Sequence, residues 1–79
     1  MTMARAFIAE ETGREYRARG QYDMFKENLE RAIKYFRATR MMTKAANCHE
    51  ALGEYAEAAG TYLLYLISYT RESNPVTTI

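Results

Sequence analysis

The sequence predicts an all-α fold of two antiparallel helix-turn-helix units, four helices in total, arranged as an array or a small bundle. The 79 residues contain only four glycines and one proline, too few for an all-β fold with many tight turns. Apolar residues recur at helical spacing over residues 22–36. Gly20-Gln21-Tyr22 recurs as Gly53-Glu54-Tyr55, 33 residues later. This recurrence predicts two copies of one unit.

The first unit is expected to contain helices at about residues 2–19 and 21–38. In the first helix, small or apolar residues fall at near-helical spacing: Ala6, Ala9, Gly13, Tyr16 and Ala18. Gly20 should end this helix, because glycine adopts the left-handed conformation without a Cβ clash. In the second helix a clean amphipathic stripe consists of Tyr22, Phe25, Leu29, Ala32, Ile33 and Phe36.

The second unit is expected to contain helices at about residues 40–52 and 54–72, separated by Gly53. The inner face of the third helix should consist of Met42, Ala45, Ala46, His49 and Leu52. One face of the fourth should consist of Tyr55, Ala58, Ala59, Tyr62, Leu66 and Tyr69. Pro75 breaks the pattern, so a single domain is expected over residues 1–72, followed by a flexible C-terminal tail at 73–79.

The two units align over residues 6–38 and 39–71. Identical pairs are Ala18/Ala51, Gly20/Gly53 and Tyr22/Tyr55, and pairs of similar size are Gly13/Ala46, Leu29/Tyr62, Ile33/Leu66 and Phe36/Tyr69. This pattern resembles the tetratricopeptide repeat (TPR), a 34-residue helix-turn-helix unit. The resemblance implies a scaffold or adaptor that binds a peptide or a partner helix.

The chain departs from the usual repeat in three ways. Its period is 33 residues, Ala9 and Met42 replace the early bulky aromatic residue, and Arg37 and Thr70 replace the terminal proline. A second resemblance, over residues 6–36, is to the MIT domain. It implies a three-helix bundle that binds amphipathic peptide helices in trafficking machinery.

The TPR resemblance also implies a concave groove on the first helix of each unit. Outward residues there would be Phe7, Glu10, Arg14, Arg17, Arg40, Thr43, Lys44 and Asn47. Of these, Arg14, Arg40, Lys44 and Asn47 are candidates for holding a peptide's terminal carboxylate or an acidic segment by charge-assisted hydrogen bonds. The alternative interpretation is a solvated helix face.

The fourth helix carries no charged residue from Ala58 to Thr70. Leu63, Leu64 and Ile67 lie off the tyrosine stripe, so the helix is apolar around much of its circumference. The terminal helix of a stack normally shows a polar outer face. We therefore expect an interface that includes Tyr62, Leu63, Leu64, Tyr65, Ile67 and Tyr69, and a homo-oligomer or a subunit of a larger complex. The alternative is a closed four-helix bundle around this helix.

Composition argues against several other functions. Residues 1–40 carry nine Lys/Arg and six Asp/Glu, a net +3, while residues 41–79 carry two and four, a net −2. Such mild polarity is unlike the dense basic face of a nucleic-acid binder. The apolar run at 62–69 is far shorter than the ~20 residues of a membrane span. The N-terminal residues lack the apolar run of a secretory signal.

Cys48 and His49 are the only cysteine and the only histidine. Neighbours on a helix point about 100° apart, so they do not form a catalytic dyad, and a zinc site needs about four ligands. We expect a buried thiol and a packing histidine, with no catalytic residue, cofactor or metal site, and a reduced, cytoplasmic setting. A small enzyme would require a site assembled by an oligomer.

Overall fold

The computed structural model describes residues 3–73, which form four α-helices joined by short turns. These are α1 (Met3–Ala18), α2 (Tyr22–Ala38), α3 (Met42–Ala51) and α4 (Tyr55–Ser73). The described residues contain no strand, which confirms the predicted all-α class. Of the predicted tail, Ser73 is the last residue of α4, and residues 74–79 lie outside the described part.

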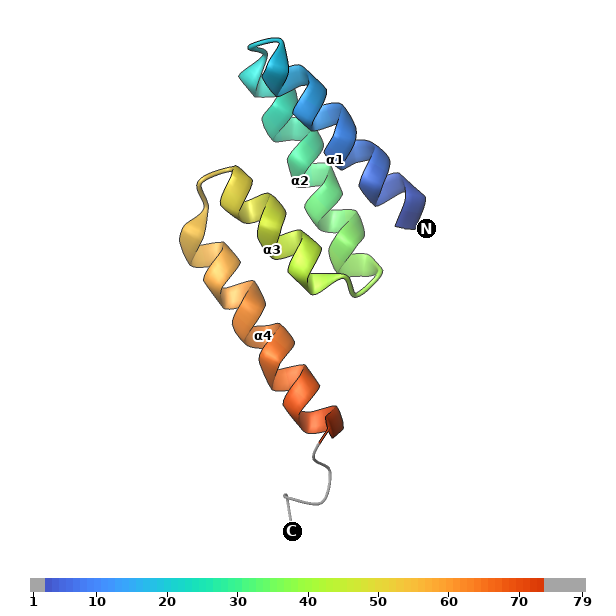
Figure 1. Ribbon diagram of the computed structural model, residues 1–79, viewed down its shortest axis with the longest axis vertical. Helices are drawn as coiled ribbons and strands as arrows, with labels where there is room; N and C mark the ends of the chain where they lie inside the picture. The colour runs from blue at the N-terminus through green and yellow to red at the C-terminus, as the bar shows by residue number, and fades with distance from the viewer. Residues whose placement is uncertain (1–2, 74–79) are drawn as a thin grey trace.

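The helices pack in chain order, α1 on α2, α2 on α3 and α3 on α4. Figure 1 shows two antiparallel hairpins side by side, with α1 at one edge and α4 at the other. The extents of 54 × 27 × 13 Å describe a long, thin molecule. The chain is therefore an open array of two hairpins, neither a closed four-helix bundle nor a three-helix bundle.

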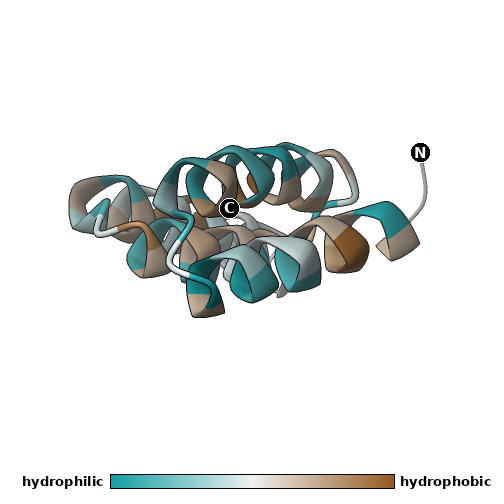
Figure 2. Ribbon diagram, turned by 90° about the horizontal axis from the view of Figure 1, so that it is seen from above, coloured by the Kyte–Doolittle hydropathy of each residue, from teal (hydrophilic) through white to brown (hydrophobic). Residues whose placement is uncertain are grey.

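The core is centred on α2. Buried side chains on this helix meet small residues from both neighbouring helices; the cluster consists of Phe25, Leu29, Ala32, Ile33, Phe36, Ala6, Ala9, Ala45 and Cys48. The predicted stripe of α2 is confirmed except at Tyr22, which lies exposed in the first turn. Figure 2 shows hydrophobic and hydrophilic residues alternating along each helix, as amphipathic packing requires.

Each inter-helix turn ends with a residue in the left-handed conformation. Gly20 has φ 76° and Gly53 has φ 78°. The Gly20 N–H donates to Arg17 O and the Gln21 N–H to Tyr16 O, both at 2.9 Å. This pair of bonds defines a Schellman motif, and Gly53 and Glu54 repeat it. The two glycine turns therefore have the same backbone structure, as their sequences predict.

The turn between α2 and α3 uses the same motif without a glycine. Arg40 has φ 61°, and the Met41 N–H donates to Phe36 O at 2.7 Å. The expected start of the third helix at Arg40 is therefore wrong, because Arg40 closes the turn and α3 begins at Met42. A side chain in this conformation is strained by about 1 kcal/mol.

Positions 33 residues apart have equivalent surroundings in the two units. Asn28 on α2 donates its side-chain N–H to Met24 O at 2.8 Å, and Thr61 on α4 donates its hydroxyl to Glu57 O at 2.9 Å. Both polar side chains are buried. Gly13 and Ala46, the small residues of α1 and α3, are also both buried.

Candidate docking surface

The second half of α4 extends beyond the helix it packs on. α3 has 10 residues and α4 has 19. At about 1.5 Å per residue, α3 covers only about half the length of α4. Ala58 and Thr61 are buried in the first half, whereas every residue from Leu63 to Thr70 is exposed. Figure 1 shows the second half protruding from the array.

The expected buried face of α4 is therefore mostly wrong. Ala58 is buried and Tyr62 is half-buried, but Ala59, Leu66 and Tyr69 are exposed, and Tyr55 is 71% exposed. In the first unit, α1 with 16 residues runs along the whole of α2 with 17. The second unit has no such match in length, so the residues of α4 beyond α3 have no neighbouring helix to cover them.

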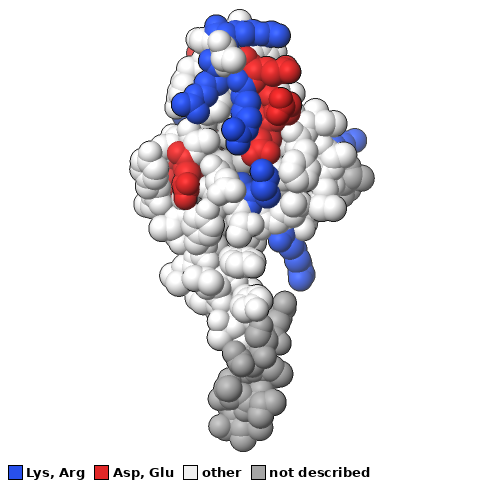
Figure 3. Space-filling view, in the orientation of Figure 1, with Lys and Arg blue, Asp and Glu red and all other residues white. Residues whose placement is uncertain are grey.

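These uncovered residues form what we call the α4 patch. Its six side chains are between 39% and 59% exposed: Leu63, Leu64, Tyr65, Leu66, Ile67 and Tyr69. Four of the five residues predicted for the interface belong to it, and the fifth, Tyr62, is half-buried beside it. In Figure 3 charged side chains gather over the upper part of the molecule, and the protruding part of α4 is white.

A groove lies where the α4 patch meets the start of α3. We call it the α4 groove; it encloses about 680 Å³ and is lined by Arg40, Met42, Leu64, Tyr65, Ser68 and Tyr69. The Tyr65 and Tyr69 rings are stacked, with centroids 6.4 Å apart. Because Arg40 adds a guanidinium to an otherwise uncharged lining, the groove can hold an apolar side chain beside a carboxylate.

A buried carboxylate links α1 to α3. Glu10 is 6% exposed, and its carboxylate lies 3.4 Å from Arg14 Nη2 and 3.1 Å from Lys44 Nζ. Lys44 Nζ also lies 5.4 Å from the Phe7 ring centroid and 5.6 Å from that of Phe36. The expectation that Glu10 projects outward is wrong, because Ala6, Ala9 and Gly13 place position 10 on the buried stripe.

The four predicted groove residues do not gather in one place. Arg14 and Lys44 converge on Glu10, although the Arg14 side chain remains 60% exposed. Asn47 accepts a hydrogen bond from the Tyr62 hydroxyl at 2.7 Å, which joins α3 to α4. Arg40 lines the α4 groove instead. Of the four, Arg40 is thus the one placed beside the α4 patch.

Cys48 and His49 have structural surroundings and separate partners. Cys48 is buried, with its Sγ 3.8 Å from Glu10 Oε2. Burial, and then the negative charge of Glu10, raise the pKa of the Cys48 thiol to about 12. His49 Nδ1 lies 2.8 Å from Glu54 Oε1. Within residues 3–73, no group of three or more His, Cys, Asp or Glu side chains could hold a metal ion.

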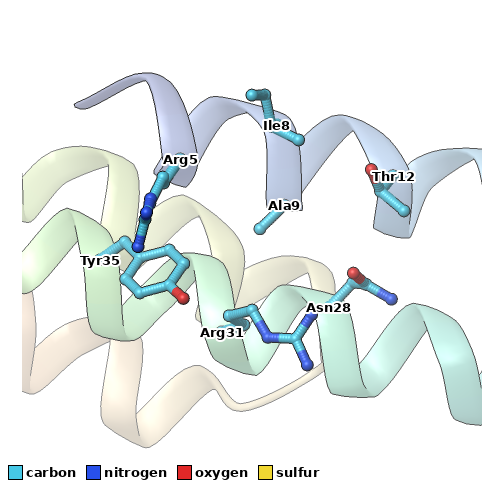
Figure 4. Close-up of a pocket in the computed structure, with 7 residues that line it drawn as sticks. All are labelled: Arg5, Ile8, Ala9, Thr12, Asn28, Arg31 and Tyr35. Atoms are coloured by element: carbon cyan, nitrogen blue, oxygen red, sulfur yellow. The ribbon is translucent and has the colours of Figure 1, made fainter. Parts of the chain in front are cut away.

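A second hollow lies between α1 and α2, on the opposite edge of the array (Figure 4). It encloses about 360 Å³ and is lined by Arg5, Ile8, Ala9, Thr12, Asn28, Arg31 and Tyr35. Arg5 reaches toward Tyr35, whereas Ile8 points away from α2. Two guanidinium groups make this edge polar, in contrast to the α4 patch.

Two further comparisons complete the description of the surface. Among the described helices, none combines the length and apolar composition needed to cross a membrane. No protein-family model, curated protein or solved structure matches this chain.

Proposed function

We propose that the chain is a non-enzymatic protein–protein interaction module, a TPR-like scaffold or adaptor. It binds a partner peptide or helix and self-associates through α4. The observation that supports this proposal is the α4 patch, six large apolar side chains exposed on a helix without charge. Side chains of this size have about 150–250 Å² of surface each, so the patch exposes roughly 600 Å². That equals the largest patches on typical monomers, which mark interaction sites.

The α4 groove is the part of this surface that suits a peptide. Tyr65 and Tyr69 offer large areas with polar tips, and immobilising them costs little conformational entropy. Met42 and Leu64 supply flexible apolar walls. Arg40 at the rim can pair with a carboxylate of the partner. The groove therefore favours a peptide with an apolar side chain next to an acidic group or a terminal carboxylate.

The same proposal places the protein in a reducing compartment such as the cytoplasm. Its single cysteine is a buried free thiol. Small proteins of oxidising compartments usually rely on several disulfides.

Peptide selection followed by calorimetry tests this function. Peptides are selected from a random display library on the wild-type chain and then titrated into Tyr65→Glu/Tyr69→Glu. The two carboxylates should weaken binding at least tenfold, because they add charge to an apolar contact surface. Tyr55→Glu is the matched control, since Tyr55 is exposed on α4 but lies outside the α4 patch; it should bind as the wild type does. A selection that yields no binder, or binders unaffected by the double substitution, would contradict the proposal.

A further inference from the structure

α4 has a second exposed side, which points away from α3. Ala58 and Thr61 mark the side buried against α3. With 3.6 residues per turn, the opposite side carries Ala56, Gly60, Leu63 and Ile67. All four are exposed, and a Cβ added to Gly60 would meet nothing within 4 Å. We call these four residues the outer stripe.

The outer stripe has the spacing of a helix-pairing seam. Its steps of 4, 3 and 4 residues are those of the apolar positions in a heptad repeat. The stripe is also graded in size. Its N-terminal half consists of Ala56 and Gly60 and its C-terminal half of Leu63 and Ile67. One half is therefore shallow and the other half protrudes.

Charge indicates what kind of surface covers this stripe. α4 has no charged residue from Ala58 to Thr70, so a charged surface placed against it would lose hydration without gaining a partner. The opposite edge of the array exposes Arg5 and Arg31, which disfavours head-to-tail stacking of copies. The surface of this chain that best meets the requirement is α4 itself.

Size decides how two such helices align. In a parallel pair, Gly60 would face Gly60 and Ile67 would face Ile67, which leaves a gap at one end and a clash at the other. In an antiparallel pair, Gly60 faces Leu63 and Ala56 faces Ile67, so each large side chain meets a small one. Well-packed helix pairs alternate large and small residues in this way. The antiparallel arrangement therefore fills the seam.

We propose that two copies of the chain pair antiparallel through the outer stripe, with Gly60 of each against Leu63 of the other and Ala56 against Ile67. The inference rests on the proposed function, because it takes α4 as the surface for association. A two-fold contact of this kind closes after two copies. Stable interfaces bury about 800 Å² per partner, and the roughly 600 Å² of the α4 patch supplies much of this area. The α4 groove lies toward α3 and stays open for a peptide.

Disulfide trapping tests the register. The full chain is made as Ala56→Cys/Ile67→Cys, with both single variants as matched controls, and oxidised mildly before non-reducing electrophoresis. Antiparallel pairing brings residue 56 of one copy to residue 67 of the other, so the double variant should form a covalent dimer in most of the protein. In the singles the two new thiols would lie about 16 Å apart, 11 residues along the helix, and should not cross-link. Wild-type chain, with Cys48 buried, should stay monomeric on the gel.

Two results would overturn the inference. Cross-linking of either single variant to the level of the double would show a parallel or random contact, and a double variant that stays monomeric would show that the outer stripe is not paired in this register. Circular dichroism confirms that each variant is folded, which is expected because both positions are exposed. The selected peptides separate the two proposals. If they still bind the double variant while no cross-link forms, the pairing alone is wrong and the proposed function stands.

Discussion

At the scale of single residues, the most constrained group is the Glu10 carboxylate. It lies in the core and holds Lys44 from α3 and Arg14 from its own helix. The neighbouring Cys48 thiol faces the same carboxylate. Because a thiolate beside a buried carboxylate would be repelled as well as poorly solvated, Cys48 stays neutral over the whole physiological range of pH.

This surrounding predicts a pH dependence of stability. The thiol has a pKa near 9.0 in the unfolded chain and about 12 in the folded one. Between these values the unfolded chain has lost its proton and the folded chain has kept it. The free energy of unfolding should therefore be unaffected by Cys48 below pH 9 and should fall as pH rises from 9 toward 12.

Urea unfolding of the wild type and of Cys48→Ala, at pH 7 to 10.5, measures this effect. Lysines and tyrosines titrate in both proteins, so the difference between the two curves isolates the thiol. The wild type should lose its advantage over Cys48→Ala as the pH rises above 9. A difference that stays constant across this range would contradict the assigned surroundings of Cys48.

At the scale of the helices, α1 and α2 approach closely at Gly13. A Cβ at this position would meet Leu29 Cδ2 and would lie 3.3 Å from both Asn28 Cβ and the Phe25 carbonyl oxygen. Leu29 is itself fully buried, so it cannot move aside. The absence of a side chain at Gly13 therefore sets the distance between the two helices.

Gly13→Ala should lower the free energy of unfolding by about 1–2 kcal/mol, because overpacking outweighs the gain of about 1 kcal/mol in helix propensity. Chemical denaturation measures the change. The control is Glu11→Ala, an alanine on the exposed side of the same helix, which should alter stability by less than about 0.5 kcal/mol. Equal or higher stability of Gly13→Ala would show that the helices can separate.

The helices themselves were largely predictable from sequence, because local signals determine them. The α2 stripe and the two glycine turns act within a few residues of each other. The burial of Glu10 was also readable, since position 10 shares a stripe with Ala6, Ala9 and Gly13. The turn at Arg40 was not, because an arginine gives no local sign of a left-handed conformation.

The exposure of α4 was predictable only in part. The lack of charge from Ala58 to Thr70 indicated an exposed apolar surface, and Leu63, Leu64, Tyr65 and Ile67 are exposed. The exposure of Leu66 and Tyr69 depends on α3 being much shorter than α4. That is a relation between two helices, so the periodicity of α4 alone does not contain it.

At the scale of the whole molecule, the array has two unlike edges. The α1 edge carries guanidinium groups, and the α4 edge is uncharged. A chain of 79 residues buries a small core, so burial of the α4 edge in a complex would add substantially to its stability. Association through α4 therefore accounts both for the apolar composition of this helix and for its length beyond α3.

Sedimentation equilibrium of the wild type and of Leu63→Glu tests this claim most directly. The wild type should show the mass of two chains at micromolar to millimolar concentration. Leu63→Glu should show the mass of one chain with an unchanged helical spectrum, because a carboxylate on the outer stripe cannot be buried without a partner. Lys34→Glu, an exposed substitution on α2, should remain dimeric. A wild-type chain that keeps the mass of a single chain at millimolar concentration would contradict the account.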